Sequence, residues 1–291
     1  MKPSYLSAEN NFCVRLMSPL GRYPAESLYC ETAALIISPE ICFSVTQIGR
    51  GHGWASEVDR LTPAEIPLFG SVVLSGEVGH PYLYPYPTVD AITLNFPSVD
   101  AINELVGLEC KARLIEFIKS EYEEAVFGFH KPPLLGGGTY DIDGQKLNKT
   151  DFERTFFKLQ KSDLVTQRGV NCLLKARMAF LHPELGEAGC IYLWIALDAA
   201  HSLVLEGLRA KGIQNPSSKD AARYFDEWLG DETEWEKFFE NDYENRIRAI
   251  HPANRIGAES IPQFMADDFY ELNDLLIPFF HSLVLAAPAL P

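Results

Sequence analysis

A break in composition between residues 131 and 149 constrains the fold of this chain more than any other feature. Residues 131–139 read Lys-Pro-Pro-Leu-Leu-Gly-Gly-Gly-Thr, and such a run of prolines and glycines cannot form a helix. Short β-forming runs precede this stretch, whereas helical periodicity follows it. We therefore predict an α+β protein with a mixed α/β domain at 1–130, a linker or long loop at 131–149, and a helical bundle at 150–291.

The first domain is predicted to be mostly β. Runs of β-forming residues, separated by Gly, Pro and Ser, occur at 33–37, 41–48, 70–78 and 89–96. One helix is predicted over residues 98–127, where Ser98 is a suitable N-cap and apolar residues recur at helical spacing. The pattern does not indicate a role for this domain.

Helices are predicted through the second domain, at 150–181 with breaks, 190–211, 218–229, 231–252 and 265–285. Thr150 and Glu153 form a capping-box pattern at its start. Gly212 is predicted to end the second of these helices, and Pro278 to kink the last one.

Charge and cysteine usage limit the function classes. The chain has 25 basic and 40 acidic residues, a net charge of −15, which excludes an ordinary basic nucleic-acid-binding domain. The six cysteines include no Cys-x-x-Cys pair, so we predict no zinc site and a reduced protein. Residues 1–12 are polar and do not form a signal peptide, and the apolar stretch 190–208 contains Asp198, His201 and Glu206. We therefore expect a cytoplasmic protein without a membrane span.

Most sequence motifs for catalysis or cofactor binding are absent. The glycine-rich stretch 49–53 lacks the Gly-Lys-Ser/Thr ending of a phosphate-binding loop, and residues 141–144 lack most ligands of a calcium loop. We read both as turns. No Gly-x-Ser-x-Gly or His-Glu-x-x-His motif is present. We accordingly expect neither a cofactor nor a metal.

One segment has the residues for metal-independent RNA cleavage. Arg246 lies five residues before His251, near the end of the predicted helix 231–252. An arginine binds phosphate bidentately and a histidine transfers protons near neutral pH, so the pair suits attack by the RNA 2′-hydroxyl. Arg248 and Arg255 would add local positive charge for binding. Five residues turn a helix by about 500°, so the pair converges only if the helix unwinds or a second subunit completes the site.

The pattern Tyr-x-x-Arg-x4-His, on a late helix of a helical bundle, resembles the HEPN superfamily. Tyr243, Arg246 and His251 carry this resemblance, which covers at most residues 151–291. It implies a bundle that dimerises, with Arg246 binding phosphate, His251 transferring a proton and Tyr243 contributing to binding. Ile247 and Ala253 depart from the polar residue and the tyrosine found in some active members.

Two alternatives remain open at this site. Arg177 and His182 have the same spacing and form a competing site. Arg246 and His251 could also be structural, as an ion pair and a helix cap. The function predicted is a metal-independent endoribonuclease of toxin or defence type. The alternative is a non-catalytic dimeric module that binds a nucleotide, RNA or a partner protein.

Overall fold

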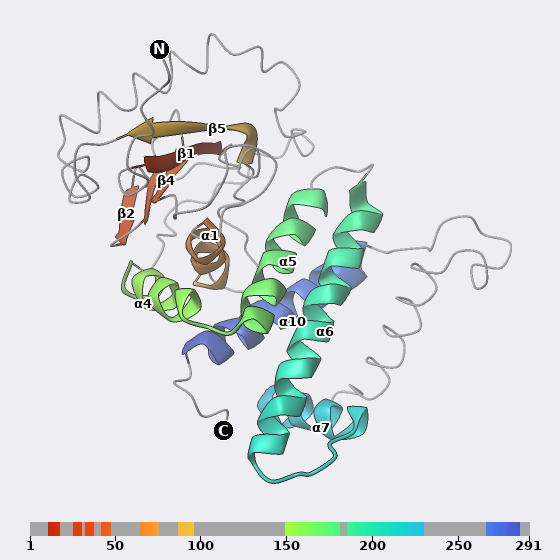
Figure 1. Ribbon diagram of the computed structural model, residues 1–291. Coiled ribbons are helices and arrows are strands. Elements are labelled where there is room, and N and C mark those ends of the chain that lie inside the picture. The colour runs from red at the N-terminus through yellow and green to blue at the C-terminus, as the bar shows by residue number, and fades with distance from the viewer. Residues whose placement is uncertain are drawn as a thin grey trace, which may run out of the picture. The chain divides into compact units, whose positions relative to one another are not determined.

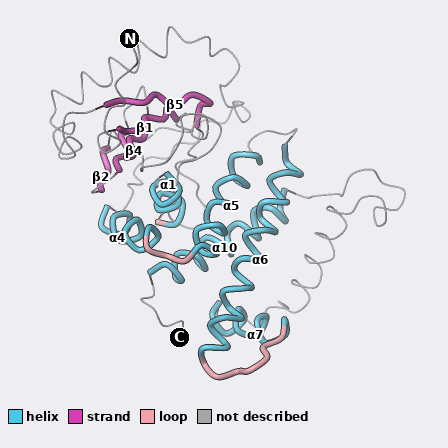
Figure 2. The backbone as a smooth tube through the Cα atoms, viewed as in Figure 1, coloured by secondary structure: helices cyan, strands magenta, loops and turns pink. Residues whose placement is uncertain are grey.

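The computed structural model describes residues 11–17, 26–30, 33–37, 42–47, 65–75, 87–95, 149–180, 185–229 and 266–285 (Figure 1). The chain divides into two compact units, Met1–Gln160 and Lys161–Pro291. In Figure 2 the described strands, all of which belong to the first unit, are magenta, and the helices, which occur in both units, are cyan. The sequence-based division put residues 150–160 with the bundle, whereas these residues belong to the same compact unit as the sheet.

The first unit contains an antiparallel five-stranded sheet. Its strands are β1 (Asn11–Met17), β2 (Glu26–Cys30), β3 (Ala33–Ile37), β4 (Cys42–Gln47) and β5 (Pro87–Asn95). Their order is β2-β3-β4-β1-β5, and each neighbouring pair is antiparallel. Two residues separate β2 from β3, and Cys30 pairs with Ala33 at that end. The β1–β5 register shifts between Arg15 and Met17, which marks a bulge.

Two helices complete the described part of this unit. Helix α1 (Glu65–Leu74) contacts β3, and α4 (Lys149–Gln160) contacts β2 and α1. In Figure 1, α1 lies beneath the sheet and beside α4. Almost every residue of α1 is buried, and Phe69, Phe152 and Phe156 are among the largest fully buried side chains. These aromatic rings form much of the core of this unit.

The prediction of a mostly β first domain is not supported. Strands β3, β4 and β5 confirm three of the four predicted strand segments, but the segment 70–78 was predicted wrongly, because α1 runs through residues 65–74. A short apolar run such as Val72-Val73-Leu74 fits a buried helix as well as a buried strand. The unit is therefore mixed. The predicted helix 98–127 and the linker up to residue 148 lie outside the described residues.

The second unit consists of helices in its described part. These are α5 (Leu164–Phe180), α6 (Gly186–Ala210), α7 (Ser218–Leu229) and α10 (Ala266–Leu285). Helices α5 and α6 run side by side, α10 crosses both, and α7 contacts α6 (Figure 1). The Phe225 and Phe279 rings, 4.7 Å apart between centroids, join α7 to α10. Trp194 and Phe280 are also fully buried in this core.

These helices agree closely with the sequence prediction. Residues 218–229 match α7 at both ends, and α10 (266–285) lies within one residue of the predicted helix 265–285 and contains Pro278. Helix α6 begins at Gly186, four residues before the predicted start. The predicted helix 231–252 lies outside the described residues. The described part of the second unit is therefore helical, as predicted.

Among the described helices, α6 is long and apolar enough to cross a membrane. Its most apolar window has a mean hydropathy of 1.6, and 56% of that window is buried inside the protein. The core helix of a soluble protein meets the same criteria, so this property alone is weak evidence for a membrane span.

Candidate functional site

The residues favoured from the sequence lie between α7 and α10, outside the described residues: Tyr243, Arg246, Arg248, His251 and Arg255. The same holds for His182 of the competing site. Arg177 is the one predicted site residue that the structure describes. Neither predicted arginine–histidine pair therefore falls wholly within the described residues, and both pairs stay predictions.

Arg177 lies in the last turn of α5, and its side chain is only 7% exposed. Arg177 takes part in an interaction within the protein, and a buried arginine needs such interactions to offset the loss of hydration. An arginine that binds an RNA phosphate has to be accessible to that phosphate. The burial of Arg177 therefore favours a structural role and weakens the competing site.

Two cysteines of the second unit are buried thiols. Cys172 on α5 and Cys190 on α6 form no disulfide. Burial raises the pKa of the Cys172 thiol, although Lys175 and Arg168 act in the opposite direction. A protonated, buried thiol is a poor nucleophile. Among the residues that the structure describes, no three His, Cys, Asp or Glu side chains gather in a way that could hold a metal ion.

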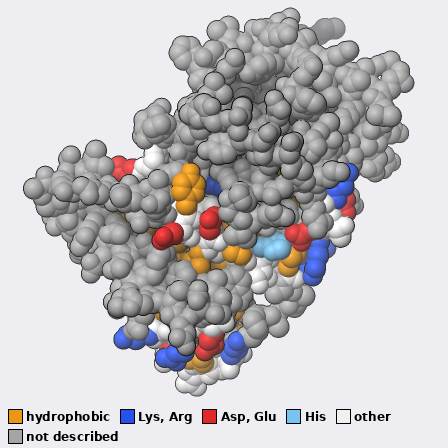
Figure 3. Space-filling model, turned by 180° about the vertical axis from the view of Figure 1, so that it is seen from behind, with side chains coloured by type: hydrophobic (Ala, Val, Ile, Leu, Met, Phe, Trp, Pro, Cys, Tyr) orange, Lys and Arg blue, Asp and Glu red, His pale blue; other side chains and the backbone are white. Residues whose placement is uncertain are grey.

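A group of exposed basic side chains lies where α6 ends and α7 begins. This basic corner consists of Arg209, Lys211, Lys219 and Arg223. Acidic residues are interspersed with it: over residues 206–227 the four basic residues are matched by four acidic ones, Glu206, Asp220, Asp226 and Glu227, so this stretch carries no net charge. Figure 3 shows Lys and Arg side chains at the lower end of the view, with Asp and Glu side chains among them.

The backbone at the end of α6 has a defined geometry. Gly212 has a φ of +96°, and its N–H donates to the carbonyl of Arg209 at 2.9 Å. The N–H of Ile213 donates to the carbonyl of Leu208 at 3.1 Å. These two bonds around a left-handed glycine form a Schellman cap, as predicted for Gly212. The cap fixes the last turn of α6, which carries Arg209.

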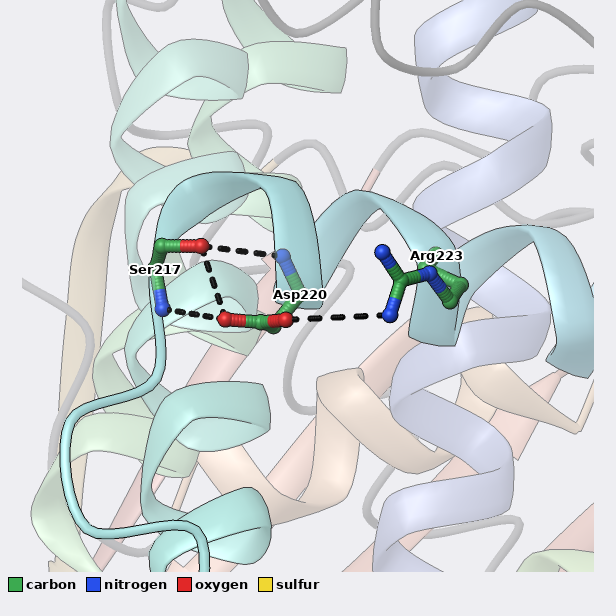
Figure 4. A network of polar contacts seen from close by, with 3 residues as sticks. All are labelled: Ser217, Asp220 and Arg223. Atoms are coloured by element: carbon green, nitrogen blue, oxygen red, sulfur yellow. Dashed lines mark hydrogen bonds and ion pairs between the residues drawn. The ribbon is translucent and has the colours of Figure 1, made fainter.

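The start of α7 is held by a capping box (Figure 4). The backbone N–H and hydroxyl of Ser217 donate to Asp220 Oδ2 at 2.8 and 2.7 Å. The N–H of Asp220 donates back to Ser217 Oγ at 3.3 Å. The amide and hydroxyl of Ser217, together with the charge of Arg223, hold the pKa of Asp220 below its usual range. The first turn of α7 is thereby ordered.

Two side chains of the basic corner contact residues of α7 that lie beside it. Arg223 Nη1 lies 3.9 Å from Asp220 Oδ1, yet the Arg223 side chain is 70% exposed. Lys211 Nζ lies 5.4 Å from the centroid of the Tyr224 ring, in a cation–π contact. The half-buried Tyr224 has a raised pKa because of its burial. The corner thus combines fixed positive charge with an aromatic ring.

Sequence reasoning missed the basic corner. The signal was present as four Lys or Arg residues within fifteen positions, but it does not show in the total charge. Comparison with known protein families, with curated proteins and with solved structures gave no match for this chain. A functional assignment therefore starts from the chemistry of the chain's own residues.

Proposed function

We propose that this chain is a HEPN-like, metal-independent endoribonuclease of toxin or defence type. The observation that carries the proposal is the spacing of Tyr243, Arg246 and His251, in the segment that connects two helices of a helical unit. The burial of Arg177 supports this choice of site, because it leaves Arg246 as the better candidate for contact with phosphate.

The chemistry follows from the properties of the two side chains. His251 accepts the proton of a ribose 2′-hydroxyl, and the 2′-oxygen then attacks the adjacent phosphorus. Arg246 stabilises the additional negative charge on the pentacovalent phosphorus. The bond to the 5′-oxygen breaks as that oxygen receives a proton from a general acid. The products are a 2′,3′-cyclic phosphate and a 5′-hydroxyl, and a second subunit contributes its own pair in a composite site.

The test is cleavage of single-stranded RNA by the full chain in EDTA. Loss of a general acid–base group slows such a reaction by roughly 10²–10⁴-fold, so His251→Ala should lose cleavage to this extent. His182→Ala is the matched control and should cleave at the rate of the wild type. Loss of cleavage in His182→Ala alone would move the site to the other pair. Light scattering checks the dimer that a composite site requires.

A second candidate function is a non-catalytic dimeric module that binds a nucleotide, RNA or a partner protein. The net charge of −15 favours this alternative, because it opposes the approach of long RNA. Ile247 also favours it, since it stands where active members of the resembled superfamily often have a polar residue. A wild-type protein that binds RNA or a nucleotide but cleaves none of several RNAs would support this function.

A further inference from the structure

We propose that the first unit binds a small phosphate-bearing ligand on one face of its sheet, at Arg15, Ser44 and Thr46. This ligand goes beyond the proposed function, which concerns the second unit and gives the first unit no role. Three observations support the site. They are two fully buried hydroxyls without a described partner, an arginine opposite one of them in the sheet, and an irregularity of the sheet beside that arginine.

The two hydroxyls belong to β4. Ser44 and Thr46 are two residues apart on this strand, so they lie on one face of the sheet. Both are 0% exposed, and Val45 on the opposite face is buried as well. Among the residues that the structure describes, neither Ser44 Oγ nor Thr46 Oγ1 has a hydrogen-bond partner. Because a buried hydroxyl without a partner costs stability, the pair indicates a polar group that this face holds.

The register of the sheet places an arginine opposite Ser44. In the β1–β4 ladder, Arg15 pairs with Ser44 and Cys13 pairs with Thr46. Directly opposite residues of an antiparallel pair share a face, so Arg15 lies on the face of the two hydroxyls. On the other side of β1, the register with β5 shifts between Arg15 and Met17. Bulges are over-represented next to active sites, where they redirect a side chain.

These three residue types match the chemistry of a phosphate group. A guanidinium binds phosphate bidentately, and serine and threonine hydroxyls donate to further oxygens. Residues two apart on a strand are separated by about 7 Å, a span that one oxyanion bridges with two hydrogen bonds of about 2.7 Å. A phosphate has more oxygens for these donors than a carboxylate has. Because both hydroxyls are 0% exposed, the ligand is a small enclosed molecule rather than a polymer.

The first part of the test is the stability of the full chain without phosphate. Thr46→Val keeps the shape of the side chain and removes its hydroxyl. If that hydroxyl serves a ligand, the substitution removes a buried polar group without a partner, so the Tm should rise by about 2–4 °C. A hydroxyl with a structural role would lower the Tm instead. Ser44→Ala is the second variant and should raise the Tm for the same reason.

The second part is binding of inorganic phosphate, measured by isothermal titration calorimetry. A hydrogen bond to a charged group contributes about 10–100-fold in affinity, so Thr46→Val should weaken phosphate binding by this factor. Arg15→Gln removes the positive charge and should weaken it about 100-fold or more. At a phosphate concentration well above the Kd, the Tm of the wild type should rise, because the ligand binds only the folded state.

Thr155→Val is the matched control. Thr155 Oγ1 is also buried without a described partner, but it lies on α4, which contacts α1 and β2, and β3 separates β2 from β4. The control should therefore bind phosphate with the affinity of the wild type. Phosphate also stabilises folded proteins in general, because it is excluded from their surface. That gain should be the same in the control and in Thr46→Val.

Four outcomes decide the inference. Weaker phosphate binding in Thr46→Val and Arg15→Gln, but not in Thr155→Val, would support it, whether or not the wild type cleaves RNA. An equal effect of phosphate on all variants would overturn it, even for an active ribonuclease. Binding of acetate but not phosphate would identify a carboxylate ligand and would also overturn it. If phosphate does not bind and Arg15→Gln and Glu65→Gln lower the Tm equally, Arg15 pairs with the fully buried Glu65 of α1 and the inference is wrong.

Discussion

The replacement of Gly169 by alanine tests the packing of the helical unit at its closest point. A Cβ atom at residue 169 on α5 would lie 2.7 Å from Phe280 Cε1, still closer to Phe280 Cζ, and 3.1 Å from the Cβ of Ala199. Phe280 on α10 is fully buried and stacks edge-on against Phe279, with ring centroids 5.8 Å apart. The ring therefore has little room to move aside.

The sign of the effect follows from two opposing terms. In an exposed helix, Gly→Ala stabilises by about 1 kcal/mol, because alanine loses less backbone entropy on folding. Overpacking a filled core costs about 1–3 kcal/mol. Because two ring atoms fall within distances that a Cβ does not tolerate, we expect the second term to exceed the first. Gly169→Ala should destabilise the helical unit by about 1–2 kcal/mol.

The assay is urea denaturation of the full chain followed by circular dichroism and fluorescence, together with thermal unfolding. A loss of this size should lower the Tm by roughly 3–8 °C in a unit of this length. Gly186→Ala is the matched control, because a Cβ there meets nothing within 4 Å. It should change the free energy of unfolding by no more than about 0.5 kcal/mol.

A double variant separates the clash from other effects. Phe280→Leu removes the ring edge that meets the new methyl group, so Gly169→Ala should cost less in the Phe280→Leu background than in the wild type. If Gly169→Ala instead raises the stability by about 1 kcal/mol, helix propensity dominates, and the close approach of α10 to α5 is refuted.

Three further predictions concern other described residues. Burial raises the pKa of Asp163, but its hydrogen bonds from the hydroxyl and amide of Thr166 (2.6 and 2.8 Å) outweigh this, so its pKa lies below 3.8. The stability that the ionised Asp163 contributes is fully present above the pKa of the unfolded state and is lost as the pH falls through the pKa of the folded state. In urea titrations, the free energy of unfolding of Asp163→Asn should therefore fall less steeply below about pH 4 than that of the wild type. Cys172 and Cys190 should react with a thiol reagent only after denaturant is added, because both are buried. Ser217→Ala should cost the protein about 1 kcal/mol in urea denaturation, since it removes the N-cap of α7.

The helices of the second unit could be predicted because their signals are local. Helix α7 starts directly after Ser217, which forms a capping box with Asp220, and Gly212 ends the preceding helix with a left-handed φ. These features depend on residues within a few positions of one another. The sequence alone therefore locates α7 at both ends.

The errors in the first unit have a different physical origin. Helix α1 is buried almost all round, so it has no polar face to set a helical period. Strands β1 and β2 were not predicted, and they pair with β4, β5 and β3. Apart from β2 with β3, these pairings join segments far apart in sequence. Their stability comes from tertiary contacts, which a local pattern does not contain.

The same distinction between local and total properties applies to charge. The net charge of −15 argues against nucleic-acid binding only if a phosphate experiences the charge of the whole chain. At physiological ionic strength the Debye length is about 8 Å, so a phosphate at the surface responds mainly to the side chains beside it. At the basic corner those side chains are four basic and four acidic residues within positions 206–227, so the local charge there is balanced. The proposed function instead relies on the positive charge of Arg246, Arg248 and Arg255, and high salt should weaken RNA binding if phosphate contacts with these residues supply its affinity.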